Sequence, residues 1–159
     1  MSIMGGELSA PSLEFVFELR VTIAATVEIG STASGVRRTV PITGGTFHGP
    51  RISGRVMPGG ADWQLVQSDG LTHVDAHYIL ETDDGVRIEV RNEGIRHGAS
   101  SVLARIVAGE RVDPSEYYFR TTPRFRPSGG SYGWLERSVF LGLAERYSDL
   151  VIIKVWMVL

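Results

Sequence analysis

The sequence predicts an all-β protein, a single antiparallel β-barrel of about nine or ten strands with short helical turns. From Leu13 to Ile29, apolar residues occupy every second position, which is the period of a strand with one buried face. This run is much longer than the roughly five or six residues of an ordinary strand, and long strands are typical of curved barrel walls. Turn-forming residues separate the later apolar segments. A two-sheet β-sandwich is the alternative architecture.

The later expected strands share apolar, β-branched or aromatic residues bounded by turn formers, and they span 36–42, 47–57, 62–67, 73–82, 86–92, 117–125, 139–143 and 151–158. Pro41 places its strand at an edge or an end, because proline has no N–H to donate to a ladder. Asp83-Asp84-Gly85 predicts a hairpin. Residues 101–108 fit either a short helix or a strand, and helical turns are expected at 114–116 and 135–137.

Length and composition limit the classes of protein. The 159 residues most simply form one domain, with 1–11 as a flexible N-terminus and 12–159 as the barrel. The absence of cysteine excludes disulfides and thiolate chemistry. A net charge of −2 argues against nucleic-acid and membrane-surface partners, both of which need a basic field. No signal-peptide pattern opens the chain, so we expect a cytoplasmic protein.

The main candidate for chemistry is Asp62, which together with Trp63 follows a stretch rich in glycine and proline. A carboxylate beside an indole at the mouth of a barrel would be desolvated and suited to proton transfer near neutral pH. The alternative is that Asp62 caps a turn through backbone N–H groups while Trp63 fills the core.

Histidines supply further candidates. His48, next to Gly49-Pro50, is a possible general base. His73, Asp75 and His77 share one face of a strand, but the two histidines would lie about 13 Å apart, too far to bind one metal ion, so no metal site is expected. Asp75 and His77 form an acid–imidazole pair if their face points into the lumen. The opposite face is more apolar, and burial alone would turn the histidines outward.

The segment 117–125 interleaves aromatic residues with arginines. Such a strand can stack an aromatic ligand on Tyr118 and bind its carboxylate or phenolate through Arg120 or Arg124. Cross-strand aromatic packing with solvated arginines is the alternative. Trp134, in a polar and aromatic turn, is a further stacking candidate. Serine-hydrolase, kinase and dinucleotide-dependent enzymes are not supported, because their glycine-rich motifs do not occur.

Several motifs together resemble the bacterial family of unknown function DUF3237. They are the Gly44–Pro50 turn, the Pro58–Trp63 segment, the Thr82–Gly85 hairpin, the Tyr118–Phe125 strand and the Tyr132–Leu135 turn. The resemblance extends from Phe15 to Val158, with the motifs in the family's order. It implies a compact β-barrel, often an oligomer, with a pocket of uncharacterised chemistry.

The sequence favours a cofactor-independent acid–base enzyme of the isomerase, hydro-lyase or cyclase type, acting on a small aromatic or carbonyl-bearing metabolite in the barrel lumen. The candidates for proton transfer are Asp62, His48, His77 and Asp75. The candidates for substrate binding are Trp63, Tyr118, Arg120, Arg124 and Trp134. We expect neither a metal nor an organic cofactor, and the expected partners are a small-molecule ligand and further copies of the chain. The alternatives are a lipocalin-like binding protein without catalysis and an oligomeric scaffold joined through the apolar C-terminal strand.

Overall fold

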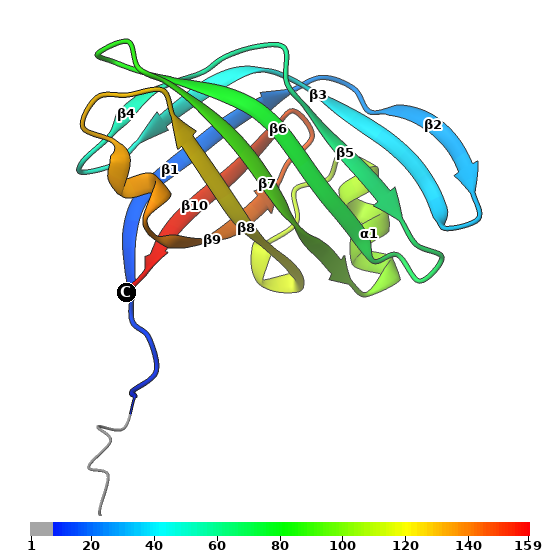
Figure 1. The fold of residues 1–159 in the computed structure, drawn as a ribbon. Coiled ribbons are helices and arrows are strands. Elements are labelled where there is room, and N and C mark those ends of the chain that lie inside the picture. Colours follow the sequence, from blue (N-terminus) through cyan, green and yellow to red (C-terminus); the bar gives the residue numbers. More distant parts are fainter. Residues whose placement is uncertain (1–7) are drawn as a thin grey trace, which may run out of the picture.

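In the computed structural model, which describes residues 8–159, ten strands form one antiparallel sheet closed into a barrel, and the all-β prediction is confirmed (Figure 1). The strands are β1 (Leu13–Ile23), β2 (Val27–Thr32), β3 (Gly35–His48), β4 (Ser53–Val56), β5 (Ala61–Val66), β6 (Thr72–Thr82), β7 (Arg87–Gly98), β8 (Tyr117–Pro127), β9 (Val139–Arg146) and β10 (Leu150–Val158). The helices are α1 (Ser100–Val107) and the short η1 (Pro114–Glu116) and η2 (Gly133–Glu136). Residues 1–7 of the expected flexible N-terminus lie outside the described part of the chain.

The barrel closes because β1 pairs with both β10 and β3. From β10 the neighbours run through β9, β8 and β7 to β6, and both β4 and β5 join β6 to β3. The circuit β1-β10-β9-β8-β7-β6-β5-β3 therefore contains eight strands, with β4 and β2 in addition. The apolar C-terminal segment is β10, and Val155 and Met157 are buried inside the barrel. This strand is thus part of the wall, whatever else its outer face contacts.

The alternation predicted one long strand from Leu13 to Ile29. In the structure this segment divides into β1 and β2. A bulge at Val16, between Phe15 and Phe17, shifts the alternation, so that Phe17 points inward while Phe15 lies on the outer wall. Because β2 extends beyond the closed circuit, Val27 and Ile29 are 53% and 58% exposed. The prediction was wrong because alternation cannot show where the closed part of a sheet ends.

The sequence predicted that Pro41 lies on an edge strand or at the end of its strand. In the structure Pro41 lies inside β3, where it pairs with Ala61 of β5. On its other side the chain passes between β1 and β2, and the Ala24 N–H donates to the Pro41 carbonyl oxygen at 3.0 Å. The proline ring is tolerated because the ladder is interrupted there. Farther along β3, Gly45 has a φ of +133°, and a Cβ at this position would clash with the carbonyl oxygen of Arg20. This glycine lets β1 and β3 approach closely where β3 moves from β5 to β4.

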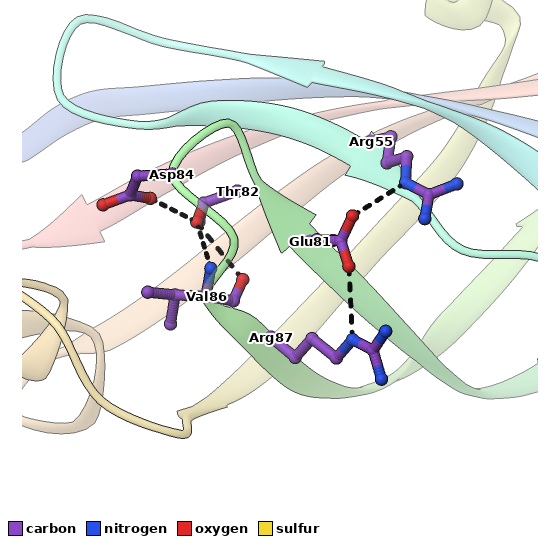
Figure 2. Close-up of polar contacts among 6 residues, drawn as sticks. All are labelled: Arg55, Glu81, Thr82, Asp84, Val86 and Arg87. Carbon is purple, nitrogen blue, oxygen red and sulfur yellow. Dashed lines mark hydrogen bonds and ion pairs between the residues drawn. The ribbon is translucent and has the colours of Figure 1, made fainter.

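The predicted hairpin at Asp83-Asp84-Gly85 joins β6 to β7, and Figure 2 shows how its turn is held. The Thr82 hydroxyl accepts the Val86 N–H at 2.8 Å and donates to the Asp84 carboxylate. Beside the turn, Glu81 pairs with Arg55 of β4 at 3.1 Å and with Arg87 of β7 at 3.2 Å. These contacts tie three neighbouring strands together at the end of the barrel away from α1 (Figure 1).

Aromatic side chains fill that end of the lumen. Phe17 packs edge-on against Phe47 and Phe125, with ring centroids 5.8 and 5.3 Å apart. Phe125 in turn packs against Phe140 at 5.2 Å. All four rings are fully buried. The lumen is therefore plugged at this end, which is the end away from α1.

Helix α1 resolves the ambiguous segment 101–108 and lies at the other end of the barrel (Figure 1). Val102 and Ile106 pack against the core, whereas Val107 is 76% exposed. Within residues 8–159, no helix has the length and apolar character needed to cross a membrane.

Candidate functional site

Of the four residues predicted to move protons, Asp62 alone points into the barrel. Side chains alternate along β5, so Asp62 and Gln64 face inward while Trp63 faces outward. Asp62 lines a lumen cavity of about 40 Å³ together with Tyr78, Asn92 and Arg146. A single buried water molecule needs about 10–15 Å³ of such cavity volume, so the cavity has room for a few non-hydrogen atoms.

Hydrogen bonds fix both oxygens of the Asp62 carboxylate. Oδ1 accepts the backbone N–H of Asp75 at 2.9 Å, and Oδ2 accepts Nε2 of Gln64 at 2.7 Å. The other end of the Gln64 amide accepts Nε of Arg38 at 2.7 Å. The carboxylate is therefore held in one orientation and connected to a guanidinium at the mouth of the barrel.

Burial controls the acidity of this carboxyl. It raises the pKa of Asp62, and the lowering by the two hydrogen bonds and by the charges of Arg96 and Arg146 is the smaller effect. Burial also raises the pKa of the Tyr78 phenol, and the charge of Asp62 adds to that shift. A carboxyl that keeps its proton to a higher pH than usual can donate that proton and recover it, which is what acid–base catalysis needs.

Three inward-facing arginines, which were not predicted as site residues from the sequence, surround the α1 end of the lumen. Arg38 comes from β3, Arg96 from β7 and Arg146 from β9. With part of the β1–β2 connection and the end of α1, they line a hollow of about 320 Å³. Arg146 also lines the Asp62 cavity, so the mouth and the lumen meet at its side chain.

The arginines carry more positive charge than their surroundings balance. Among residues 8–159, none of the three forms an ion pair with a carboxylate. Burial and the neighbouring charges of Arg146 and Arg38 lower the pKa of Arg96 to about 10. Burial likewise lowers the pKa of Arg38 and Arg146, against the opposing influence of Asp62. The mouth of the barrel is thus electropositive and suited to an anion.

The other predicted proton-transfer residues lie away from Asp62. His48 is exposed near the plugged end of the barrel, at the end of β3. His77 is exposed on the outer wall, where its Nε2 lies 3.5 Å from Glu89. The Asp75 side chain lies on the same wall and accepts two hydrogen bonds from Arg91, at 3.2 and 3.0 Å. This face of β6 is outside because the residues that alternate with it fill the lumen. In the described part of the chain, no cluster of three or more acidic, histidine or cysteine side chains is placed to bind a metal ion.

The predicted binding residues do not gather around Asp62 either. Trp63 is 47% exposed on the outer wall. Tyr118 stacks on His97 with centroids 5.0 Å apart, and the Arg120 guanidinium lies 5.2 Å from the Tyr118 ring. Arg124 is exposed on the same face of β8. Trp134 lies at the plugged end, where the Arg51 guanidinium lies 4.1 Å from its ring. On β8 it is Tyr117 and Phe119 that face inward.

The fold and the site together define a closed β-barrel with a buried carboxyl and a basic mouth at one end. The chain belongs to the family of proteins of unknown function DUF3237, whose model matches residues 11–158, and the resemblance seen in the sequence is confirmed. A UPF0311 protein of Rhodopseudomonas palustris (strain TIE-1) is 43% identical over 151 residues, which are 94% of this chain and 99% of the relative.

Two further comparisons bear on structure and chemistry. The crystal structure of a conserved protein of unknown function from Rhodopseudomonas palustris superimposes with a TM-score of 0.91 at 41% identity, covering 96% of this chain and 100% of the other. The hydroalkoxylation enzyme phnH of Penicillium herquei is 30% identical over 90 residues, 57% of this chain and 60% of the relative. The family is therefore established, and one distant relative is an enzyme.

Proposed function

We propose that the protein is an acid–base enzyme in which Asp62 transfers a proton to and from a small substrate at the α1 end of the barrel. The observation that carries the proposal is the half-buried, inward-facing Asp62 carboxyl, which is fixed by two hydrogen bonds and has a raised pKa. It lies where a lumen cavity meets a basic hollow through Arg146. A titratable group perturbed by burial and placed next to a cavity is the usual mark of a catalytic acid or base.

Addition of a hydroxyl group to a carbon–carbon double bond is the reaction class that we favour. One carbon gains the oxygen and the other gains a hydrogen, so the reaction needs no oxidant or reductant. Asp62 in its carboxylate form takes the proton from the attacking hydroxyl, and the resulting acid donates a proton to the other carbon. The distant relative supports this class, because hydroalkoxylation is the addition of an alcohol across a double bond. Hydration, elimination of water and isomerisation require the same proton transfers.

The arginines fit such a reaction when the double bond is conjugated to a carbonyl group. Attack of the hydroxyl then places negative charge on the carbonyl oxygen before carbon is protonated. Fixed guanidinium groups in a dry site stabilise developing negative charge strongly. Arg96 and Arg146 supply these charges close enough to Asp62 to influence its pKa.

A lipocalin-like binding protein has less support. Ligand cavities usually measure about 300–1,000 Å³, whereas the lumen cavity measures about 40 Å³. Most of a ligand would therefore occupy the mouth rather than the lumen.

Turnover by an Asp62 variant tests the proposal. Purified protein is incubated in D₂O with 2′-hydroxychalcones, whose phenol can reach the β-carbon of the enone through a six-membered ring, and with ortho-allyl phenols, and deuterium incorporation at carbon is followed by NMR. We expect Asp62→Asn to lose about 100-fold or more of the rate. Asp69→Asn is the matched control, since Asp69 only accepts the Leu71 N–H in an exposed turn, and an amide oxygen can keep that bond. Full turnover by Asp62→Asn would overturn the proposal.

A further inference from the structure

We propose that Arg38, Arg96 and Arg146 form a carboxylate-binding subsite, and that the substrates of this barrel are small carboxylic acids whose reacting carbon is directed toward Asp62. The second half of this inference rests on the proposed function. The first half rests on the arginines alone and can be tested without any knowledge of the reaction.

Each of the three arginines is supported by a neighbouring side chain. Gln64 accepts Nε of Arg38 at 2.7 Å. The Arg96 guanidinium lies 5.3 Å from the centre of the Phe119 ring. The backbone N–H of Arg146 donates to the Tyr117 hydroxyl at 2.9 Å, which ties the end of β9 to the start of β8. The Arg38 and Arg96 guanidinium groups and the backbone of Arg146 are thus positioned before any ligand arrives, which lowers the entropic cost of binding.

Arg96 brings a strongly buried donor to the hollow. Its side chain is only 5% exposed, and its Nε has no hydrogen-bond partner among the residues that the structure describes. Burying an unpaired charged donor is costly, and such groups normally find an ion or a hydrogen-bond acceptor. The charge of Asp62 raises the pKa of all three arginines, and the charge of the exposed Glu28 raises that of Arg38. A bound anion would supply both the acceptor and the missing negative charge.

The lining of the hollow favours a carboxylate on a small apolar body. Ala24, Ala25, Ile106 and Val107 supply apolar surface beside the arginines. A volume of about 320 Å³ suits a ligand at the small end of the usual range, such as a one-ring acid. Arginine binds carboxylate and phosphate equally well by geometry. However, residues at the C-terminal end of α1 line the hollow, and the partial negative charge of a helix C-terminus disfavours a phosphate dianion more than a carboxylate monoanion.

The arginine subsite lies next to the lumen cavity that Asp62 lines. Arg146 borders both the hollow and the Asp62 cavity, so a carboxylate on the arginines leaves its neighbouring atoms at the junction. An unsaturated acid bound in this way presents the carbons next to its carboxylate to Asp62.

Calorimetric binding of benzoate and cinnamate tests the inference, with benzamide, cinnamamide and phenyl phosphate for comparison. We expect the two acids to bind, the amides to bind about 10- to 100-fold more weakly, and phenyl phosphate to bind more weakly than benzoate. Arg96→Gln should lower benzoate affinity by a similar factor. Arg146→Lys keeps the positive charge but loses the planar fork, so it should retain the fold and still weaken binding. Arg126→Gln is the matched control, because Arg126 is exposed on the outer face of β8.

Each outcome is decisive. Equal affinity for benzoate and benzamide, absence of benzoate binding at millimolar concentration, or an equal loss in Arg126→Gln would overturn the subsite. Tighter binding of phenyl phosphate would overturn the choice of carboxylate. If circular dichroism shows that Arg96→Gln does not fold, the benzoate affinity of Arg146→Lys alone decides. Asp62→Asn separates this inference from the proposed function, because a variant that binds benzoate and keeps full turnover contradicts the catalytic role of Asp62 but not the subsite.

Discussion

The Gln64 amide joins Asp62 to Arg38, since its Nε2 donates to Asp62 Oδ2 at 2.7 Å and its Oε1 accepts Arg38 Nε at 2.7 Å. Gln64 is itself buried. One neutral side chain therefore fixes the direction of the lumen carboxylate and of one mouth arginine. This bridge couples the proton-transfer group to the anion subsite.

Removing the bridge should destabilise the protein. Gln64→Met leaves a buried carboxylate oxygen and an arginine donor without partners, and each such loss costs about 1–3 kcal/mol. Urea unfolding measures the change in the free energy of unfolding. Gln67→Met is the control, because Gln67 makes a surface contact with His73 and its loss should stay within about 0.5 kcal/mol. Equal effects of the two substitutions would mean that the bridge contributes nothing.

The stability of the protein should depend on pH through Asp62. Burial raises the folded-state pKa of Asp62 above the unfolded value of about 3.9. The folded protein therefore holds this proton more tightly, and the resulting stability is complete below the unfolded pKa and is lost as the pH rises through the folded pKa. Unfolding at several pH values should show the wild type losing stability relative to Asp62→Asn as the pH rises. A difference that is constant, or that changes in the opposite direction, would contradict the raised pKa.

The aromatic plug should matter for stability but not for ligand binding. Phe17 is fully buried against Phe47 and Phe125, so Phe17→Ala should cost about 3–5 kcal/mol. Phe15→Ala, on the outer wall, should cost clearly less. Benzoate affinity should be unchanged in Phe17→Ala, or in Phe17→Leu if the alanine variant does not fold. Loss of benzoate binding in both would show that the far end of the lumen belongs to the site.

Charge at the mouth should control ligand affinity. Val107 is 76% exposed and lines the hollow. Val107→Glu places a negative charge there and should weaken benzoate binding several-fold at low salt, with a smaller effect at high salt. Val107→Gln adds a similar side chain without charge and should bind as the wild type does. If the two variants weaken binding equally, the effect is steric and the electrostatic explanation fails.

We expect the chain to form a homo-oligomer through the outer wall of β1, β9 and β10. Leu13, Phe15 and Val139 are exposed on this wall, and the indole N–H of Trp156 between them is buried without a hydrogen-bond partner in residues 8–159. Light scattering after size exclusion should give a mass above 17.4 kDa. Phe15→Asp should reduce that mass, whereas Ile79→Asp, on a different wall, should not. A monomeric wild type would contradict this expectation.

Alternation and turn residues were sufficient to predict the barrel and most of its strands. The bulge at Val16 could not be predicted, because both Val16 and Phe17 are apolar and become buried. Which face of β8 points into the barrel could not be predicted either. Both faces carry large aromatic residues, and a register shift of one residue exchanges the inner and outer faces. Tyr118, Arg120 and Arg124 were for this reason considered as binding residues, although they lie outside.

Asp62 could be selected as a candidate because its carboxylate follows a rigid turn, but the inward-facing arginines were not predicted, for a specific reason. The strand expected at 86–92 continues to Gly98 in the structure. If the alternation of Ile88 and Val90 is continued, Arg96 falls on the inner face. Arg38 likewise alternates with Val40, which is buried in the lumen. Counting from buried apolar positions to the end of each strand is the signal that would have found them.

The most direct measurement is a carboxyl ¹³C NMR titration of Asp62, with its resonance assigned by comparison with Asp62→Asn. We expect a pKa above the ordinary aspartate value of about 3.9, and a further rise when benzoate is bound, because a second negative charge nearby opposes ionisation. A pKa at or below the ordinary value that does not change with benzoate would contradict both the buried acid and the anion subsite beside it.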